Sequence, residues 1–139
     1  MKTSVRVLIG LIFLASGCGK VIPDHHIHHL MLKEFKKYTP VFPMKHFNMQ
    51  IPDPLSYMQA VGFVEVVWGI MLLVGTCAMR RKAAMFLSIV MLGAIYTHFV
   101  LNEYTGCIVP IGIIAGLIWT MEPITSVVNA DGHKHDHDE

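Results

Sequence analysis

The feature that most constrains this chain is a set of four long apolar stretches that are almost free of charge. They cover residues 7–19, 54–79, 83–102 and 104–121, and charged residues bound each of them. With its flanking residues the first stretch reaches about 17 to 20 positions, so each is long enough for a helix that crosses a bilayer. The sequence therefore predicts an all-α integral membrane protein.

We expect four membrane-spanning helices, at about residues 4–22, 55–78, 83–102 and 105–122. The short connections between the last three predict antiparallel neighbours. The chain should therefore form an integral membrane four-helix bundle over residues 1–122. A polar His/Asp-rich tail follows at 123–139.

The first apolar stretch also fits a second interpretation. A basic start, an apolar run and the small residues Ala15, Ser16 and Gly17 describe a cleavable signal peptide as well as a helix. We expect a retained helix, because the polar segment before the apolar run is short.

The connection between the first and second spans is long and patterned. Its apolar residues recur at helical spacing, while lysines and a glutamate face away: Ile27, Leu30, Met31, Phe35 and Tyr38 against Lys33, Glu34, Lys36 and Lys37. We expect an amphipathic interfacial helix at about residues 24–38, between helices one and two, with Asp24 as its N-cap. Pro40 should end that helix, and Pro52-Asp53-Pro54 should form a rigid start for the second span.

Composition and charge exclude several classes of protein. Hydrophobic residues make up 53% of the chain and charged residues 15%, whereas a soluble domain carries about 25% charge. Eleven Lys and Arg against ten Asp and Glu leave no positive surplus for phosphates, so we expect the lipid bilayer and no nucleic acid as a partner. Three cysteines cannot staple the fold. We expect free thiols. In an oxidising compartment, a disulfide between Cys18 and Cys107 is the alternative.

The distribution of basic residues predicts the orientation in the membrane. Four spans place both termini on one side. The basic run Arg80-Arg81-Lys82 lies in a short predicted loop on that side, whereas the loop Asn102-Glu103-Tyr104 opposite has no Lys or Arg. By the positive-inside rule, both termini should be cytosolic.

Glu65 is the one formal charge deep inside a predicted span. An unpaired carboxylate there costs about 2.5 to 3.5 kcal/mol on insertion scales. Glu65 must therefore be protonated or meet a donor, for which Lys20, His98 and the indole of Trp68 are candidates. A structural buried pair fits, and so does a proton relay or a direct contact with a partner. With Arg6, these residues form the candidate polar network.

Small residues predict where two of the helices touch. Gly62 and Gly69 lie on the same side of the second span as Glu65, and Gly10 and Gly17 give the first span a matching surface. In lipid, glycines allow two helix backbones to approach closely. These four glycines are the candidate helix-packing residues.

Histidines suggest metal binding at first sight. They cluster at residues 25–29 and 133–137. No ligand geometry is fixed in either cluster, so we expect no metal and no cofactor. No nucleophile with a base and no Gly-rich phosphate loop occurs, so we do not expect an enzyme.

Two sets of motifs resemble known families. The pattern Arg6-x-Leu8-x-Gly10-x-x-Phe13-x-x-x-Gly17-x-x-Lys20, with Gly62-x-x-Glu65-x-x-x-Gly69, resembles the DoxX-like four-helix membrane proteins. Three segments, LKEFKKYTPVFP at 32–43, PDPLSY at 52–57 and AVGFVE at 60–65, look like the transmembrane protein 35 (NACHO) family. The resemblance covers about residues 5–122.

The narrower resemblance implies a function. It implies a non-enzymatic chaperone or auxiliary protein of the endoplasmic reticulum. Such a protein assists folding, assembly and surface delivery of pentameric ligand-gated channels of the nicotinic acetylcholine receptor type, through transmembrane helix contacts. The wider DoxX-like group implies an alternative, a redox or transporter-like membrane subunit.

Overall fold

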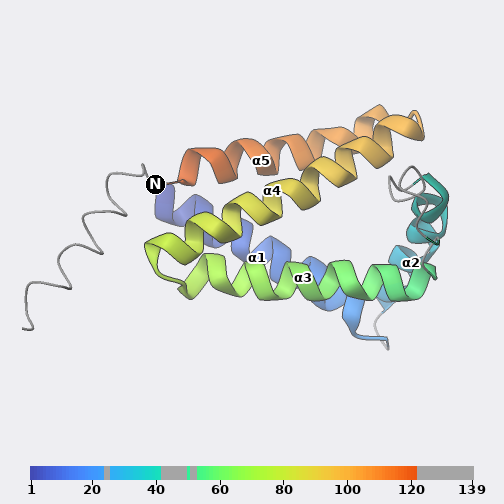
Figure 1. Ribbon diagram of the computed structural model, residues 1–139, viewed down its shortest axis with the longest axis horizontal. Coiled ribbons are helices and arrows are strands. Elements are labelled where there is room, and N and C mark those ends of the chain that lie inside the picture. The colour runs from blue at the N-terminus through green and yellow to red at the C-terminus, as the bar shows by residue number, and fades with distance from the viewer. Residues whose placement is uncertain (24–25, 42–49, 51–52, 122–139) are drawn as a thin grey trace, which may run out of the picture.

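The computed structural model describes residues 1–23, 26–41, 50 and 53–121 of the chain (Figure 1). The helices follow in the order α1 (Lys2–Val21), α2 (His26–Tyr38), η1 (Thr39–Val41), α3 (Pro54–Val74), α4 (Cys77–Val100), η3 (Tyr104–Cys107) and α5 (Ile108–Thr120). No strand occurs in these ranges, so the prediction of an all-α chain is confirmed.

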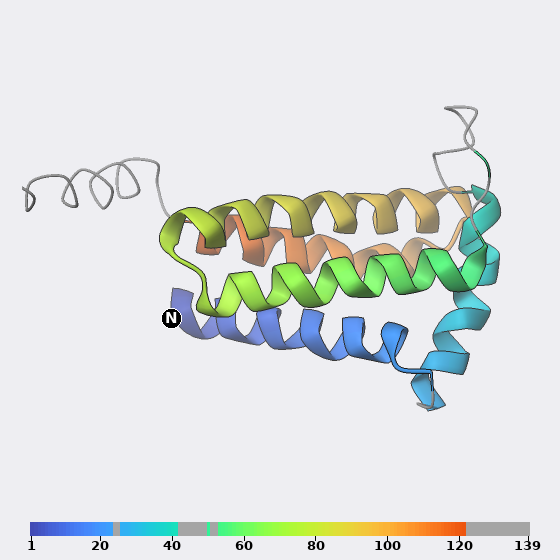
Figure 2. The same ribbon diagram turned by 60° about the horizontal axis from the view of Figure 1, so that its bottom comes forward.

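Four helices lie lengthwise and one lies across them. α1, α3, α4 and α5 run along the long axis, and α2 crosses one end of the bundle (Figures 1 and 2). The opposite end carries Met1, the turn between α3 and α4, and the last residues of α5. The two ends are called below the α2 end and the terminal end.

Three helices are long and apolar enough to cross a membrane, namely α1, α3 and α4. The predicted fourth span at 105–122 is shorter in the structure. The apolar segment Tyr104–Thr120 begins with the 3-10 turn η3, and only its last 13 residues form the α-helix α5. The reason is the tight turn after α4, where Asn102 takes a left-handed φ of 59°.

The turn between α3 and α4 corrects a second predicted boundary. α3 ends at Val74 and α4 begins at Cys77, so the predicted loop Met79–Lys82 lies inside the first turns of α4. Helix capping decides this boundary: Gly75 is extended, and the Thr76 hydroxyl accepts a hydrogen bond from the backbone N–H of Met79 at 3.4 Å. The Gly75-Thr76 pair marks the turn, and the basic residues at 80–82 lie in the helix that follows it.

The other helix starts follow local chemistry. Asp53 caps α3 by accepting from the backbone N–H of Ser56 at 3.2 Å, and Pro54 occupies the first helical position. α2 is described from His26 onwards, and residues 24–25, which include the predicted N-cap Asp24, lie outside the described residues. The interfacial position of α2 stays a prediction.

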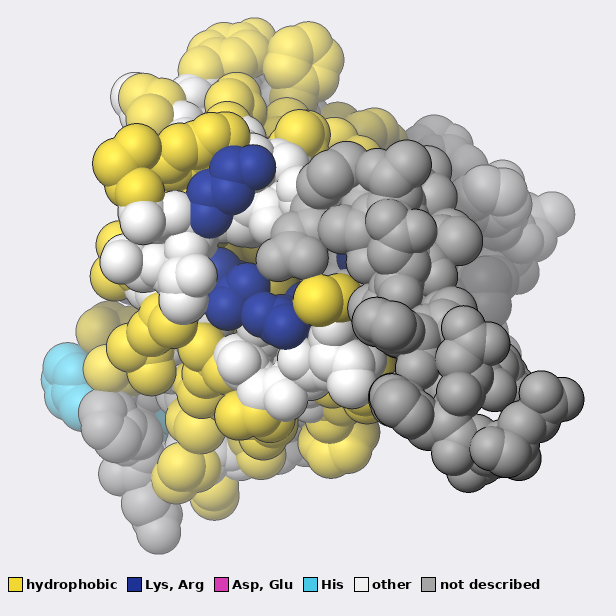
Figure 3. Space-filling view, turned by 90° about the vertical axis from the view of Figure 1, so that its left-hand side faces the viewer, with side chains coloured by type: hydrophobic (Ala, Val, Ile, Leu, Met, Phe, Trp, Pro, Cys, Tyr) yellow, Lys and Arg dark blue, Asp and Glu magenta, His cyan; other side chains and the backbone are white. Residues whose placement is uncertain are grey.

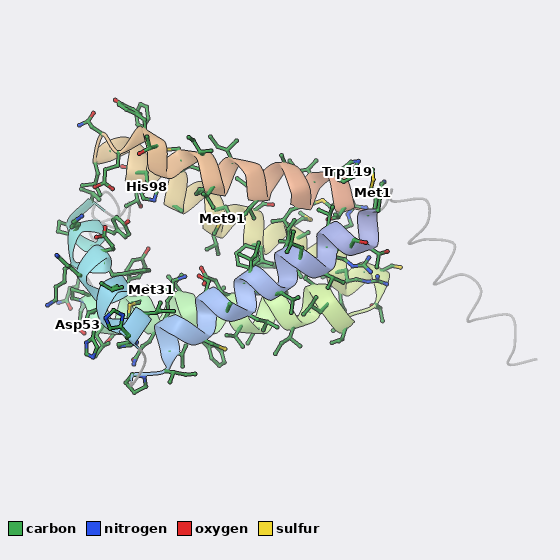
Figure 4. All side chains as sticks on the ribbon, turned by 180° about the vertical axis from the view of Figure 1, so that it is seen from behind. Met1, Met31, Asp53, Met91, His98 and Trp119 are labelled. Carbon is green, nitrogen blue, oxygen red and sulfur yellow. The ribbon has the colours of Figure 1, made fainter. Side chains whose placement is uncertain are left out.

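The core lies among the four lengthwise helices, towards the terminal end. Its buried members are Ile9, Phe13, Leu72, Ala83, Ala84, Leu87, Met91 and Leu117. α1 packs most extensively against α3. Towards the α2 end, the α4–α5 pair separates from the α1–α3 pair (Figure 4).

Candidate functional site

The candidate site begins at the contact between α1 and α3, which glycines bring very close together. A Cβ atom added to Gly17 would lie 2.6 Å from the carbonyl oxygen of Gly62. One added to Gly69 would lie 3.4 Å from the carbonyl oxygen of Gly10. The structure therefore brings all four predicted packing glycines into one interface, with backbone directly against backbone.

A buried ion pair joins the same two helices. The Nζ of Lys20, in the last turn of α1, donates to the Oε2 of Glu65 at 2.5 Å and to the Oγ of Ser16 at 2.7 Å. Lys20 exposes 7% of its surface and Glu65 exposes 3%. The long lysine side chain carries its charge from the end of α1 to the middle of α3. Each charge thereby supplies the neutralising partner that the other needs inside a membrane.

The pair does not use all of its hydrogen-bonding capacity. An ammonium has three N–H donors, and that of Lys20 makes two hydrogen bonds within the described part of the chain. Among the same residues only the Oε2 of Glu65, and not its Oε1, accepts a hydrogen bond. Counting the described residues alone, one donor of Lys20 and one oxygen of Glu65 therefore remain for a further polar group.

The other members of the predicted network lie elsewhere. The ring of Trp68 stacks on Phe86 of α4, with the centroids 4.5 Å apart and the planes at 11°. His98 lies near the α2 end, where its Nδ1 is 3.4 Å from the Oε2 of Glu103 but lacks hydrogen-bond geometry. The structure thus pairs Glu65 with Lys20, and neither His98 nor Trp68 bonds to it within the described residues.

Arg6 belongs to a separate basic cluster at the terminal end. It lines a small cavity with Arg80 and Arg81, about 20 Å³ in volume. The Nε atoms of Arg6 and Arg80 are buried, with no hydrogen-bond partner among the described residues. Figure 3 shows Lys and Arg side chains gathered on this end, with no Asp or Glu among the described side chains in view.

A large cavity of about 530 Å³ opens beside the ion pair. Its apolar wall comes from Phe35 of α2, Val61 of α3, and Ile89, Val90 and Ala94 of α4, together with Gly93. Its polar side chains are Lys20, Tyr38, Tyr57, Thr97 and His98. Figure 4 shows the region between His98, Met91 and Met31 where the helix pairs separate. A volume of 300 to 1,000 Å³ is typical of small-molecule sites.

α2 covers the cavity at the end of the bundle. The ring of Tyr38 contacts the imidazole of His98 edge to face, at 5.4 Å between centroids. Partial burial, together with the nearby carboxylates of Glu34 and Glu103, raises the pKa of the Tyr38 hydroxyl to about 12. The hydrogen bond with Glu34 raises the pKa of Lys37 above its usual value. Both groups keep their protons at neutral pH.

The metal and thiol chemistry of the described residues is limited. No group of three His, Cys, Asp or Glu side chains within 1–23, 26–41, 50 and 53–121 could hold a metal ion. His133, His135 and His137 lie outside those ranges. Cys18, Cys77 and Cys107 are free thiols, and the Sγ of Cys107 donates to the carbonyl oxygen of Ile95 at 3.7 Å.

A comparison with protein families agrees with this architecture. The DoxX family model matches residues 1–100. The chain belongs to the DoxX family. The match covers α1 to α4, and therefore includes the ion pair and every residue that lines the cavity. The predicted DoxX-like resemblance is confirmed, and the protein is a multi-pass membrane protein of the DoxX superfamily.

Most of the residues that line the cavity are not predictable as such from the sequence. Gly93, Ala94 and Thr97 line it, but small residues in an apolar stretch are also typical of ordinary helix packing and do not predict a cavity. One feature of the sequence does point to the cavity. Gly93 and Thr97 are four residues apart and therefore share one face of the helix, and His98 lies beside that face. That spacing indicates a face with little side-chain volume, but it does not indicate whether another helix fills the space.

Proposed function

We propose that this DoxX-family protein is a non-enzymatic membrane chaperone or auxiliary protein. It assists folding, assembly and surface delivery of pentameric ligand-gated channels of the nicotinic acetylcholine receptor type. It acts in the endoplasmic reticulum membrane with both termini in the cytosol. The likeness of residues 32–43, 52–57 and 60–65 to the transmembrane protein 35 family supports this client class.

The observation that carries the proposal is the division of α3 into two faces. Gly62, Glu65 and Gly69 are buried and serve contacts with α1. On the other side Phe63 exposes 64% of its surface and Ile70 exposes 45%. The charge is thus satisfied inside the chain, and a large apolar and aromatic face is left for another helix in lipid.

This division gives Glu65 an indirect role in client binding. Because Glu65 is 3% exposed and bonded to Lys20, it holds α3 in the orientation that presents Phe63 and Ile70. Its substitution should disturb client contact through the position of α3. The four-helix topology should survive, because the core and the other helix contacts remain.

The test combines crosslinking with receptor counting. Photoreactive residues replace Phe63 or Ile70 in the full chain, and Ile111 on α5, 53% exposed, serves as the matched control. We expect nicotinic subunits in native membranes to crosslink through α3 and not through α5. We also expect deletion of the protein to lower the number of surface receptors.

One result would overturn the proposal, and a second would remove one part of it. One is an absence of channel subunits from every crosslinked product, together with an unchanged number of surface receptors after deletion. The other concerns Glu65 alone: normal receptor maturation with Glu65→Gln and Glu65→Ala would remove the ion pair from the mechanism and leave only the outer face of α3.

A further inference from the structure

We propose that the cavity between α2, α3 and α4 binds a neutral lipid alcohol, a molecule with an apolar body and a single hydroxyl head. This inference concerns a different surface from the outer face of α3 and does not depend on the identity of a client. It follows from the volume of the cavity, the chemistry of its walls and its position beside the ion pair.

The size and walls of the cavity fit an apolar body. Its volume is about 530 Å³, and its lining is apolar except at a few side chains. The rings of Phe35 and Tyr57 lie 5.4 Å apart between centroids and add aromatic surface where α2 meets α3. An apolar pocket with few polar groups binds a ligand's body through burial and its head through hydrogen bonds.

The ion pair selects the charge of the head. Lys20 reaches the wall of the cavity, and Glu65 already neutralises it. A carboxylate or phosphate head would leave an excess negative charge near the middle of the membrane, which is costly. A neutral head brings no such penalty.

The spare hydrogen-bonding capacity of the pair selects the type of head. Within the described part of the chain, Lys20 has a third N–H to donate and Glu65 has Oε1 to accept. A hydroxyl both donates and accepts, so one hydroxyl can satisfy both groups. A ketone or quinone oxygen only accepts hydrogen bonds, so it would leave the carboxylate oxygen without a donor.

Entry from the bilayer is open at the edge of the cavity. Ile89 lines the cavity and exposes 62% of its surface, so the cavity wall is not closed off at this residue. A ligand dissolved in lipid therefore reaches the cavity from the bilayer without crossing water. Sterols and monoacylglycerols share the required chemistry and are the two sources to be distinguished.

Gly93 provides the decisive variant. A Cβ at Gly93 would meet no atom within 4 Å, and Gly93 lines the cavity, so a leucine there would project into the space of the ligand. Gly112 on α5 also meets no atom within 4 Å, but it is exposed and lies outside the cavity lining. Gly112→Leu is therefore a matched control for Gly93→Leu.

The experiment uses the full chain in phospholipid nanodiscs and three photoreactive, alkyne-tagged probes: cholesterol with a free hydroxyl, a monoacylglycerol and a fatty acid. We expect at least one alcohol to label peptides that line the cavity, in competition with its unlabelled form. Gly93→Leu should lower that labelling about tenfold, and Gly112→Leu should leave it unchanged. Whichever alcohol labels the cavity identifies the source.

Three results would overturn the proposal. They are labelling by neither alcohol within the cavity, equal labelling by the fatty acid, and undiminished labelling of Gly93→Leu. Thermal unfolding shows whether the variants are folded. If Gly93→Leu is not, Val61→Trp fills the cavity from α3, and undiminished labelling of that variant is equally decisive.

Discussion

The α1–α3 interface and the cavity side of α4 use glycine in opposite ways. At Gly17, an added Cβ would lie 2.6 Å from a backbone oxygen of α3, whereas at Gly93 it would meet nothing within 4 Å. Missing side chains bring two backbones together in the first case and leave a space in the second. The same residue type, in equally apolar helices, thus builds a rigid contact on one side and a cavity on the other. The ion pair stands between the two regions, since it joins α1 to α3 and its Lys20 also lines the cavity.

The largest effect should come from breaking the ion pair on the packed side. Glu65→Met replaces the carboxylate with an apolar side chain of similar length. It leaves the Lys20 ammonium buried without its partner. We expect a loss of about 3 to 5 kcal/mol in the free energy of unfolding, the usual cost of a broken buried pair. Denaturation in SDS titrations of the detergent-solubilised protein measures it. The double variant Lys20→Met with Glu65→Met should recover most of the loss, because no buried charge remains.

A glycine substitution at the interface should have the next largest effect. Gly17→Ala places a Cβ against the Gly62 carbonyl, so α1 and α3 must separate. We expect a loss of about 1 to 3 kcal/mol, typical of overpacking. The same titration measures it, with Gly112→Ala as the matched substitution on the open face of α5. Equal stability of the two variants would refute the close backbone contact.

The corresponding substitution on the cavity side should change the free energy of unfolding in the opposite direction. Gly93→Ala meets no atom within 4 Å and removes the backbone freedom of glycine in a helix. We expect a gain of about 0.5 to 1 kcal/mol in the free energy of unfolding. A loss comparable to that of Gly17→Ala would mean that the space beside Gly93 is filled and that the two sides are packed alike.

The smallest effect concerns α2, which covers the cavity. The Tyr38 hydroxyl has a pKa of about 12 in the folded protein and about 10 in an unfolded chain. Between these values the unfolded chain releases a proton that the folded chain keeps, so stability falls as the pH rises through this window. Lys37 contributes in the same direction, because its raised pKa gives a stabilising charge that is lost at high pH. We expect the melting temperature of Tyr38→Phe to fall less than that of the wild type above about pH 10.

Tyr104→Phe is the control for that measurement. Tyr104 exposes 59% of its surface and lies away from the cavity lining. Its variant should follow the alkaline decline of the wild type. An identical decline in the Tyr38 and Tyr104 variants would show that α2 does not hold the Tyr38 hydroxyl away from water.

Some of the fold was predictable because it depends on local chemistry. Uncharged stretches mark the long helices, and the Asp53-Pro54 start of α3 is a capping signal that the sequence displays directly. The turn at Gly75-Thr76 was missed, although the same kind of signal was present, because basic residues drew the boundary to positions 79–82. The short α5 was missed because the left-handed turn at Asn102 has no strong signature in an otherwise apolar segment.

By itself the sequence determined that the chain is helical, that it lies in a membrane and that Glu65 needs a partner inside it. These conclusions rest on the cost of exposing charge and backbone to lipid, which depends on residue type and spacing alone. Only the tertiary structure decided which donor Glu65 meets, because three candidates stood at suitable depths and only the crossing of α1 over α3 brings Lys20 to it. The cavity was also decided there. Whether a glycine is covered by a backbone or by empty space depends on how far helices distant in sequence diverge, and no local pattern records that distance.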